Sequence, residues 1–170
     1  RSAGCVALST DTFVISLLFF RGGDIGRLAV YGTVNDLAMA GAEPLWLTAA
    51  FVLEEGLPIT DLRRIARSMG DAARAAGVRI VTGDTKVVER GKGDGLFLNT
   101  SGVGVVPDGV ALGPERVRPG DRVLISGAIG DHGVAVLSHR QGLAFGTTLT
   151  SDSAALHGLA AALREAGREG

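Results

Sequence analysis

Blocks of apolar residues alternate with polar and glycine-rich segments along the chain, and in its first part they predict an α/β order. Short apolar runs predict strands, whereas apolar residues spaced three and four apart predict helices. The predicted strands are 5–10, 12–15, 44–53, 78–81 and 96–106, and the predicted helices are 24–41 and 60–77. With the first two runs counted as one strand, the order is β-α-β-α-β-β. Because the first two runs lie on either side of a polar stretch, Asp11 is expected within or at the end of a strand.

Both helices have predicted ends. Asp24 is expected to cap the first helix, which ends at Gly41, and Thr60 to cap the second, which ends at Gly77. The apolar residues of the second helix form one stripe, so its opposite side is expected to face solvent. That solvent-facing side carries Arg63, Arg64, Arg67 and Arg74.

The segment 44–53 is a long apolar run and is expected to be a strand buried on both faces or lying at an interface. Polar and glycine-rich loops are predicted at 82–86 and 91–95, where they separate the last strands of this region.

Turn-forming residues at 107–109 and 118–121 divide the chain into a domain over 1–107, a connection over 108–121 and a second unit over 122–170. The second unit is predicted to contain a strand at 122–126, a helix at 131–140 and an alanine-rich helix after Asp152. One strand and two helices cannot close a sheet-based core. We therefore expect the second domain to be incomplete. Since the chain does not begin with Met, we also expect the N-terminal end of the first domain to be missing.

Composition disfavours several classes of partner. The 17 Lys and Arg nearly balance the 18 Asp and Glu, and aromatic residues make up only 5%, so no nucleic acid is expected as a partner. The single cysteine, Cys5, cannot form an intrachain disulfide, which fits a reducing cytoplasm. The apolar run 13–20 is too short to span a bilayer, so no membrane contact is expected either.

Four aspartates stand among glycine and threonine residues, where turns would bring them to strand ends: Asp11, Asp36, Asp84 and Asp131. Converging carboxylates repel by about 4 kcal/mol per pair at 4 Å and an effective dielectric of 20, so such a set needs a cation. Mg²⁺ prefers oxygen ligands and usually binds through one or two carboxylates together with substrate phosphates. For each aspartate, the alternative is a hydrogen bond to nearby backbone. Lys86 is a candidate phosphate contact or a solvated side chain.

Asn35 and Asp36 lie in the middle of a mostly apolar helical segment, where a charged side chain is costly. Their neighbours on the helix face, Gly32 and Ala40, are small. Small neighbours leave room for a ligand or ion, and they equally permit close packing of another helix.

The segment 127–133, Gly-Ala-Ile-Gly-Asp-His-Gly, follows a predicted strand and opens a predicted helix, where free N–H groups attract anions. The alternative is a glycine-rich helix entry that Asp131 caps. His132 is either an acid or base or a structural residue beside that cap. The sequence contains neither a P-loop nor a dinucleotide-binding fingerprint.

Five segments closely resemble the HypE family of hydrogenase-maturation carbamoyl dehydratases, in order and at plausible spacing. They are 9–14, 19–30, 32–44, 81–88 with its Thr-Gly-Asp-Thr-Lys, and 126–133 with its Gly-Asp-His-Gly. The HypE family belongs to a superfamily of ATP-binding enzymes that includes aminoimidazole ribonucleotide synthetase, selenophosphate synthetase and thiamine-monophosphate kinase.

The resemblance implies an α/β (α+β) fold with a mixed sheet and helices on one face, and a homodimer in which the sheets pair into a barrel-like interface. It implies ATP with Mg²⁺ as cofactors. The implied cofactor-binding residues are Thr10, Asp11, Asn35, Asp36, Thr82, Gly83 and Asp84. The implied metal ligands are Asp11, Asp36 and Asp131, and the implied catalytic residues are Asp84, Lys86, Asp131 and His132.

The implied reaction is ATP-dependent dehydration of a carboxamide on a C-terminal cysteine, which yields a thiocyanate that supplies the cyanide ligand of the [NiFe]-hydrogenase iron. The implied partners are a carbamoyltransferase that loads the cysteine and an iron-carrying scaffold complex. The family's cysteine tail is absent from this sequence, and Cys5 lies at the wrong end to replace it. We therefore expect these 170 residues to dimerise and to bind nucleotide weakly but not to complete the dehydration alone.

Two other functions remain open at this point. One is another ATP-using enzyme of the same superfamily, such as a selenophosphate synthetase or a small-molecule kinase. The other is a non-catalytic dimerisation or scaffold module, for which the apolar strand 44–53 would be the pairing surface.

Overall fold

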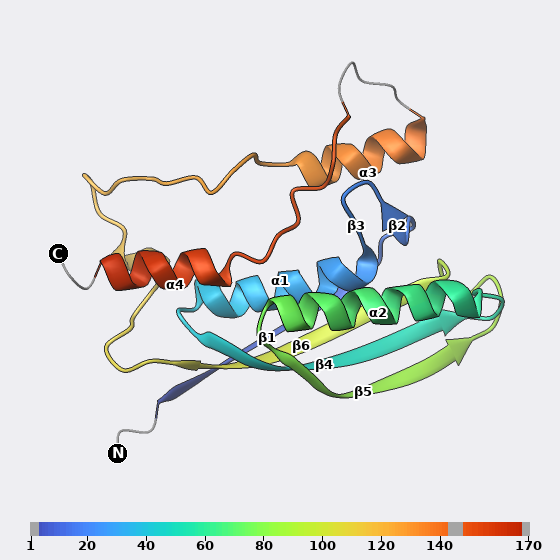
Figure 1. Cartoon of the computed structure of the whole chain (residues 1–170), viewed down its shortest axis with the longest axis horizontal. Helices are drawn as coiled ribbons and strands as arrows, with labels where there is room; N and C mark the ends of the chain where they lie inside the picture. Colours follow the sequence, from blue (N-terminus) through green and yellow to red (C-terminus); the bar gives the residue numbers. More distant parts are fainter. Residues whose placement is uncertain (1–3, 143–147, 168–170) are drawn as a thin grey trace.

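The structure is a computed structural model that describes residues 4–142 and 148–167 (Figure 1). Its strands are β1 (Cys5–Phe13), β2 (Phe19–Phe20), β3 (Gly23–Asp24), β4 (Glu43–Glu54), β5 (Arg79–Val88) and β6 (Leu96–Val106). Its helices are α1 (Ile25–Met39), α2 (Ile59–Ala75), the short 3₁₀ helix η1 (Pro114–Arg116), α3 (Asp131–Gln141) and α4 (His157–Ala166). The predicted order β-α-β-α-β-β is confirmed, with the hairpin of β2 and β3 added before α1.

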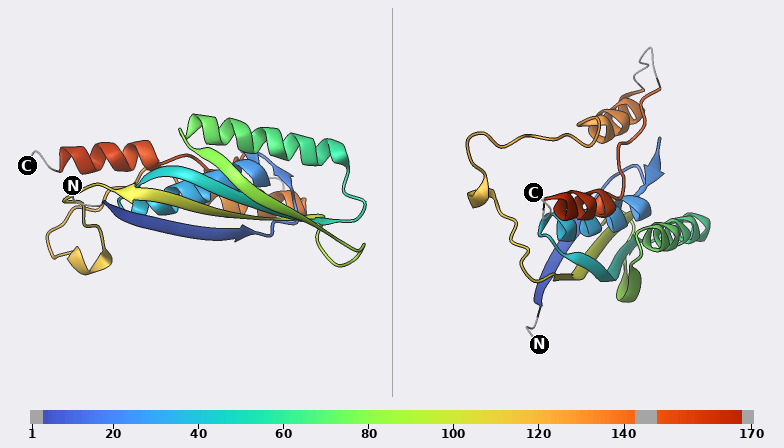
Figure 2. Two further views of the ribbon diagram at one scale, coloured as in Figure 1. Left: turned by 90° about the horizontal axis from the view of Figure 1, so that it is seen from below. Right: turned by 60° about the vertical axis from the view of Figure 1, so that its left-hand side comes forward.

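Four strands form a mixed sheet in the order β1-β6-β4-β5. Strand β6 is antiparallel to both β1 and β4, whereas β4 and β5 are parallel and are joined through α2, as a parallel pair requires. Helices α1, α2 and α4 lie on one side of this sheet (Figure 2). The fold class predicted from the sequence is confirmed, and β1 and β5 are the two edges of the sheet.

The core lies between the sheet and the helices α1 and α2. Side chains of α1 such as Ile25, Val30 and Val34 are fully buried against Leu98 of β6 and Ile65 of α2. Burying a side chain of this size is worth roughly 1.5–3 kcal/mol. Helix α1 contacts both the sheet and α2, so it is the central element of the fold.

A polar contact sits inside this apolar core, between α1 and β6. The hydroxyl oxygens of Thr33 and Thr100 lie 2.6 Å apart, and the Thr100 hydroxyl donates to the carbonyl oxygen of Ala29 at 3.0 Å. Since Thr100 has only one proton, Thr33 is the donor to Thr100. Both threonines are 0% exposed, so this pair fixes how α1 sits on the sheet.

The two predicted helix caps have different outcomes. The Asp24 carboxylate accepts hydrogen bonds from the N–H groups of Gly26 and Arg27, so the predicted cap of α1 is confirmed. The predicted cap of α2 is wrong, because the helix begins one residue before Thr60 and its N-cap position is Pro58. Proline supplies no capping oxygen, and its fixed φ of −60° directs the chain into the helix instead.

The predicted strand at 122–126 is also wrong. This segment has no regular secondary structure, and Val123, Leu124 and Ile125 are 90%, 70% and 68% exposed. A run of β-branched residues becomes a strand only when another strand offers it hydrogen-bond partners. The helix predicted at 131–140 is confirmed as α3, whereas α4 begins five residues after Asp152.

Strand β4 is less buried than its sequence indicates. Leu47 and Ala49 face the core, but Leu45 and Trp46 are exposed, so burial on both faces is contradicted within this chain. The side chains that point away from the helices have no covering element in the described part of the chain. The alternative, that β4 lies at an interface, stays a prediction.

Among the described residues, no helix combines the length and the apolar character needed to cross a membrane.

The buried threonine pair gives a first prediction. Thr100→Val should lower the free energy of unfolding by about 1–3 kcal/mol, because the hydroxyl of Thr33 then has no partner in a dry site. The double variant Thr33→Val/Thr100→Val should lose less than the sum of the two single variants. Urea unfolding of the four proteins measures this coupling.

Thr60→Val is the matched control, since Thr60 is exposed and does not cap α2. Its free energy of unfolding should change by no more than about 0.5 kcal/mol. Additive effects of the two core substitutions would contradict the role given to the Thr33–Thr100 contact.

Candidate functional site

Two of the predicted acidic residues lie on facing elements, β1 and α1. Because side chains alternate along a strand, Ser9, Asp11 and Phe13 all point toward α1. The Ser9 hydroxyl donates to the carboxylate of Asp36 at 2.8 Å. Asp11 and Asp36 therefore flank the same junction between the sheet edge and the helix.

Gly32 explains how β1 approaches α1 so closely. A Cβ atom on Gly32 would lie 2.9 Å from the ring of Phe13 and 3.8 Å from a carboxylate oxygen of Asp11. Gly32 is one helical turn before Asp36. Close packing beside Asp36 is therefore found at Gly32, but strand β1 supplies it and not another helix, and the same packing brings Asp11 toward Asp36.

The two carboxylates retain oxygens that can bind a cation. One oxygen of Asp11 accepts the N–H of Thr12 at 2.7 Å, and one oxygen of Asp36 accepts the Ser9 hydroxyl. Both aspartates are exposed, and the other oxygen of each has no hydrogen bond recorded in the described structure. Hard oxygen ligands on two facing elements fit the preference of Mg²⁺ for one or two carboxylates.

Thr10 points to the opposite side of the sheet from its neighbours. Its hydroxyl accepts hydrogen bonds from the Ser101 hydroxyl at 2.8 Å and the Asn99 amide at 3.3 Å. Asn99 also donates to the Thr12 hydroxyl at 2.9 Å. Thr10 thus belongs to a polar network on the open face of the sheet, away from Asp11 and Asp36.

The segment predicted as the loop 82–86 is instead part of strand β5. It pairs with β4 in parallel register, with Asp84 opposite Ala50 and Lys86 opposite Val52. Leu47 and Ala49 of β4 face the core, so Asp84 and Lys86 point away from the helices, to the same open face as Thr10. Non-local pairing with β4 overrides the local preference of this polar sequence for a loop.

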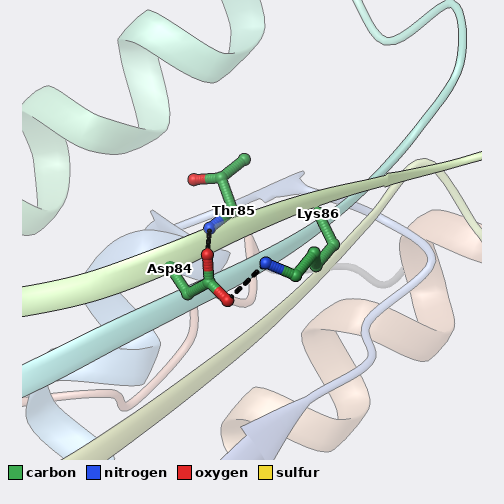
Figure 3. Close-up of polar contacts among 3 residues, drawn as sticks. All are labelled: Asp84, Thr85 and Lys86. Carbon is green, nitrogen blue, oxygen red and sulfur yellow. Dashed lines mark hydrogen bonds and ion pairs between the residues drawn. The ribbon is translucent and has the colours of Figure 1, made fainter.

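Asp84 and Lys86 form an exposed ion pair on β5 (Figure 3). Lys86 Nζ lies 2.7 Å from one oxygen of Asp84, and the N–H of Thr85 donates to the other oxygen at 2.8 Å. The hydrogen bond from Lys86, followed by that from Thr85, lowers the pKa of the Asp84 carboxyl below its ordinary 3.8. Asp84 is therefore ionised near neutral pH and holds the ammonium group of Lys86 in place.

Thr82 and Gly83 lie beside this pair, in a shallow depression of about 660 Å³ that Asp84 and Thr85 also line. A Cβ atom on Gly83 would lie only 2.0 Å from the carbonyl oxygen of Ala49 on the neighbouring strand. That oxygen belongs to the backbone and cannot move aside. Close strand packing therefore requires glycine at this position.

The described chain does not bring the Asp11–Asp36 pair and the Asp84–Lys86 pair together. Asp11 and Asp36 lie at the β1 edge, whereas Asp84 and Lys86 lie on β5, at the other edge of the sheet. The described residues also contain no group of three or more His, Cys, Asp or Glu side chains placed to hold a metal ion. Within one chain, Asp11 and Asp36 are therefore separated from Asp84 and Lys86 by the width of the sheet.

Asp131 and His132 open α3. Gly130, with a φ of 92°, occupies the N-cap position and has no side chain to cap the helix, so the alternative that Asp131 is the cap is wrong. His132 Nδ1 lies 3.0 Å from the hydroxyl of Ser151, and the N–H of His132 donates to Asp152 at 2.9 Å. The ring of His132 also packs edge-on against Phe20 at 5.0 Å. His132 thus joins α3 to the β2–β3 hairpin and to the segment before α4.

Asn35 makes contacts that sequence reasoning did not foresee. Its amide nitrogen donates to the carbonyl of Ala154 at 2.9 Å, and its amide oxygen accepts the N–H of Leu156 at 2.8 Å. Asn35 thereby fastens the chain before α4 onto α1. The sequence analysis also missed Ser9, although its place two residues before Asp11 put it on the same strand face.

Residues 1–106 match the family described as AIR synthase related protein, N-terminal domain. A carbamoyl dehydratase HypE of Bradyrhizobium diazoefficiens is 63% identical over 168 residues, which cover 99% of this chain and 49% of that protein. The chain spans about half the length of the curated relatives it matches.

Two solved structures have the same fold. A crystal structure of a HypE–HypF complex matches with a TM-score of 0.93 and 56% identity, covering 96% of this chain and 53% of that one. A crystal structure of hydrogenase maturation protein HypE in complex with ATP matches with a TM-score of 0.91 and 53% identity, covering 96% and 49%. The resemblance that the five motifs predicted is confirmed.

The Asp84–Lys86 pair gives a prediction about pH. In wild type the pKa of Asp84 should lie below 3.8, and in Lys86→Met it should rise toward that value, because the largest cause of its lowering is lost. A lowered folded-state pKa means that the pair's small contribution to stability is present above pH 3.8 and disappears as pH falls through the folded-state value. Carboxyl NMR titration measures both pKa values.

Lys92→Met is the matched control, since Lys92 is an exposed lysine in the loop between β5 and β6. It should leave the pKa of Asp84 where it is in wild type. An unchanged pKa in Lys86→Met would show that the lysine does not act on Asp84 in solution.

Proposed function

We propose, from the premise that this chain belongs to the AIR synthase related protein family and is similar to HypE over nearly its whole length, that it is the ATP-binding part of an ATP-dependent carbamoyl dehydratase. The observation that carries the proposal is the placement of Asp11 and Asp36 on facing elements. The relative solved in complex with ATP supports the choice of nucleotide.

In the proposed reaction, a carboxamide on a C-terminal cysteine is dehydrated. The carboxamide oxygen forms a bond to the γ-phosphorus of ATP, and the bond between that phosphorus and ADP breaks. The carbon–oxygen bond then breaks, phosphate leaves with the oxygen, and nitrogen gives up its two hydrogens as protons. The product is a thiocyanate, the proposed source of the cyanide ligand of the [NiFe]-hydrogenase iron.

The residues of this chain would contribute position and charge to that reaction. Asp11 and Asp36 would hold Mg²⁺, which screens the negative charge of the phosphates. Lys86, held by Asp84, would contact a phosphate oxygen as a point charge. Asp131 and His132 would complete the site from the start of α3, while Thr10, Asn35, Thr82 and Gly83 would line the nucleotide.

We further propose that two copies pair through the open face of the sheet. Val6, Leu8 and Trp46 are 61%, 76% and 43% exposed on that face, and exposed apolar side chains gathered on one surface are typical of an interaction site. Asp84 and Lys86 lie on the same face. Face-to-face pairing of two sheets would bring this pair of one copy toward the β1 edge of the other, uniting the two groups that one chain keeps apart.

The proposed partners outside the dimer are the carbamoyltransferase that loads the cysteine and an iron-carrying scaffold complex. A relative crystallised as a HypE–HypF complex supports a contact with the first of these. A cytoplasmic location fits Cys5, a free and exposed thiol.

The proposal predicts that Asp36→Asn weakens ATP binding in the full-length protein by roughly tenfold or more when Mg²⁺ is present. The reason is that an amide carries no negative charge with which it would help to hold Mg²⁺ beside the phosphates. Isothermal titration with and without Mg²⁺ measures the difference. Asp94→Asn, at an exposed loop residue, is the control with the same loss of charge and should bind ATP as wild type does.

Equal ATP affinity in wild type and Asp36→Asn would remove the proposed role of this carboxylate. If neither the wild-type protein nor the variant bound ATP, a non-catalytic scaffold module would be the better description of this protein.

The dimer proposal predicts that two inactive variants restore each other. Full-length Asp36→Asn and Asp84→Asn should each form thiocyanate slowly or not at all. After subunit exchange in equal amounts, about a quarter of all sites should contain neither substitution, because half of the dimers are mixed and each mixed dimer has one intact site. The rate of thiocyanate formation measures the recovery. No recovery from verified mixed dimers would show that each site lies within one chain.

A further inference from the structure

A groove runs between α1 and α2 on the helical side of the molecule. Its lining includes neither the Asp11–Asp36 pair nor the Asp84–Lys86 pair. The two helices lie side by side there (Figure 1), and the groove between them has a volume of about 700 Å³. Four of its lining residues are arginines: Arg27 from α1, and Arg63, Arg64 and Arg67 from α2. The sequence pattern predicted only that these three arginines of α2 face solvent.

Two of these arginines are held in place by aromatic rings. The guanidinium carbon of Arg27 lies 5.2 Å from the ring centre of Tyr31, and that of Arg64 lies 4.0 Å from the ring centre of Phe19. A guanidinium group stacked on a ring keeps its N–H donors free at its edge. The rings therefore reduce the mobility of these side chains without using their capacity to bind a carboxylate.

The carboxylates that line the groove are already engaged. Asp24 accepts two backbone N–H groups at the start of α1, and Asp71 pairs with Arg74. The ion pairs in the described part of the chain are Arg74–Asp71, Lys86–Asp84 and Arg164–Glu43. None of them includes an arginine of the groove. The lining carries four arginines and two aspartates, a net charge of +2, in a chain whose formal net charge is −1.

The shape of the groove fits an extended peptide. Its lining on α2 runs from Thr60 to Ala75, which at 1.5 Å per residue is roughly 22 Å. An extended segment of about six or seven residues covers that length. Arg63 and Arg67 are one helical turn apart, about 5–6 Å. Alternate side chains of an extended peptide are about 6.6 Å apart, so two carboxylates on such a peptide can reach both arginines.

We propose that the groove between α1 and α2 docks an extended, carboxylate-rich segment of a partner protein. Carboxylates supply the charge that the four arginines lack, and each guanidinium can hold a carboxylate through two parallel hydrogen bonds. A single small anion would engage only part of an array of this length. The proposal does not rest on the proposed catalytic activity, because the groove shares no residue with the candidate site.

Binding of a labelled hexaglutamate peptide to the whole chain tests the proposal, with hexaglutamine as the uncharged control peptide. Fluorescence anisotropy should detect binding of hexaglutamate but not hexaglutamine, and the affinity should fall as salt is added. Arg63→Gln/Arg67→Gln should weaken binding by roughly tenfold or more. Arg116→Gln/Arg118→Gln removes the same charge at exposed residues outside the groove and should bind as wild type does.

Several outcomes would overturn the proposal: no binding of hexaglutamate, equal binding of hexaglutamine, or equal weakening in the two double variants. Inorganic phosphate is the competitor that identifies a small-anion site, and complete displacement of the peptide by phosphate at the same ionic strength would also overturn it. Circular dichroism confirms that each variant is folded. ATP binding by the full-length double variants separates this result from the proposed function, because neither variant should change it.

Discussion

The position of α1 on the sheet is the constraint on which the other features of this chain depend. The buried hydrogen bonds from Thr33 to Thr100 and from Thr100 to Ala29 allow one seating of the helix on β6, since any other would leave polar groups unpaired in the core. From that seating, one flank of α1 presents Asp36 to β1. The other flank forms a groove with α2, and its later turns hold the segment before α4 through Asn35.

Local chemistry made part of this fold predictable. Asp24 stands before an apolar helical pattern and caps α1 as expected, and the lengths of β4 and β6 follow from their apolar runs. The failures come from non-local pairing. The polar sequence 82–86 is strand because β4 supplies a partner for each of its five residues, whereas the apolar sequence 122–126 is not strand because none of the described strands is paired with it. Hydrophobicity does not tell whether a neighbour is present.

The candidate site could be predicted as a set of residues but not as an arrangement. Each acidic motif follows from its own few residues, and Asp11 and Asp36 do lie across one junction. Sheet order, however, is decided by which strands pair, and β1-β6-β4-β5 sends Asp11 and Asp84 to opposite edges. The place of β1 beside β6 follows from contacts between residues 80 or more positions apart, such as Asn99 with Thr10 and Thr12, which no local pattern contains.

Charge illustrates the same limit on a larger scale. A net charge of −1 argues against a surface made for a phosphate backbone, yet it conceals how charge is distributed. Folding places Asp11 and Asp36 on one flank of α1 and collects Arg27 with three arginines of α2 on the other. No ion pair among the described residues joins the two groups, because they lie on opposite flanks of a packed helix whose apolar side chains, such as Ile25 and Val34, are buried in the core. Each flank is therefore open to charge from outside the chain, and the proposed ligands have opposite signs: a cation beside β1 and carboxylates beside α2.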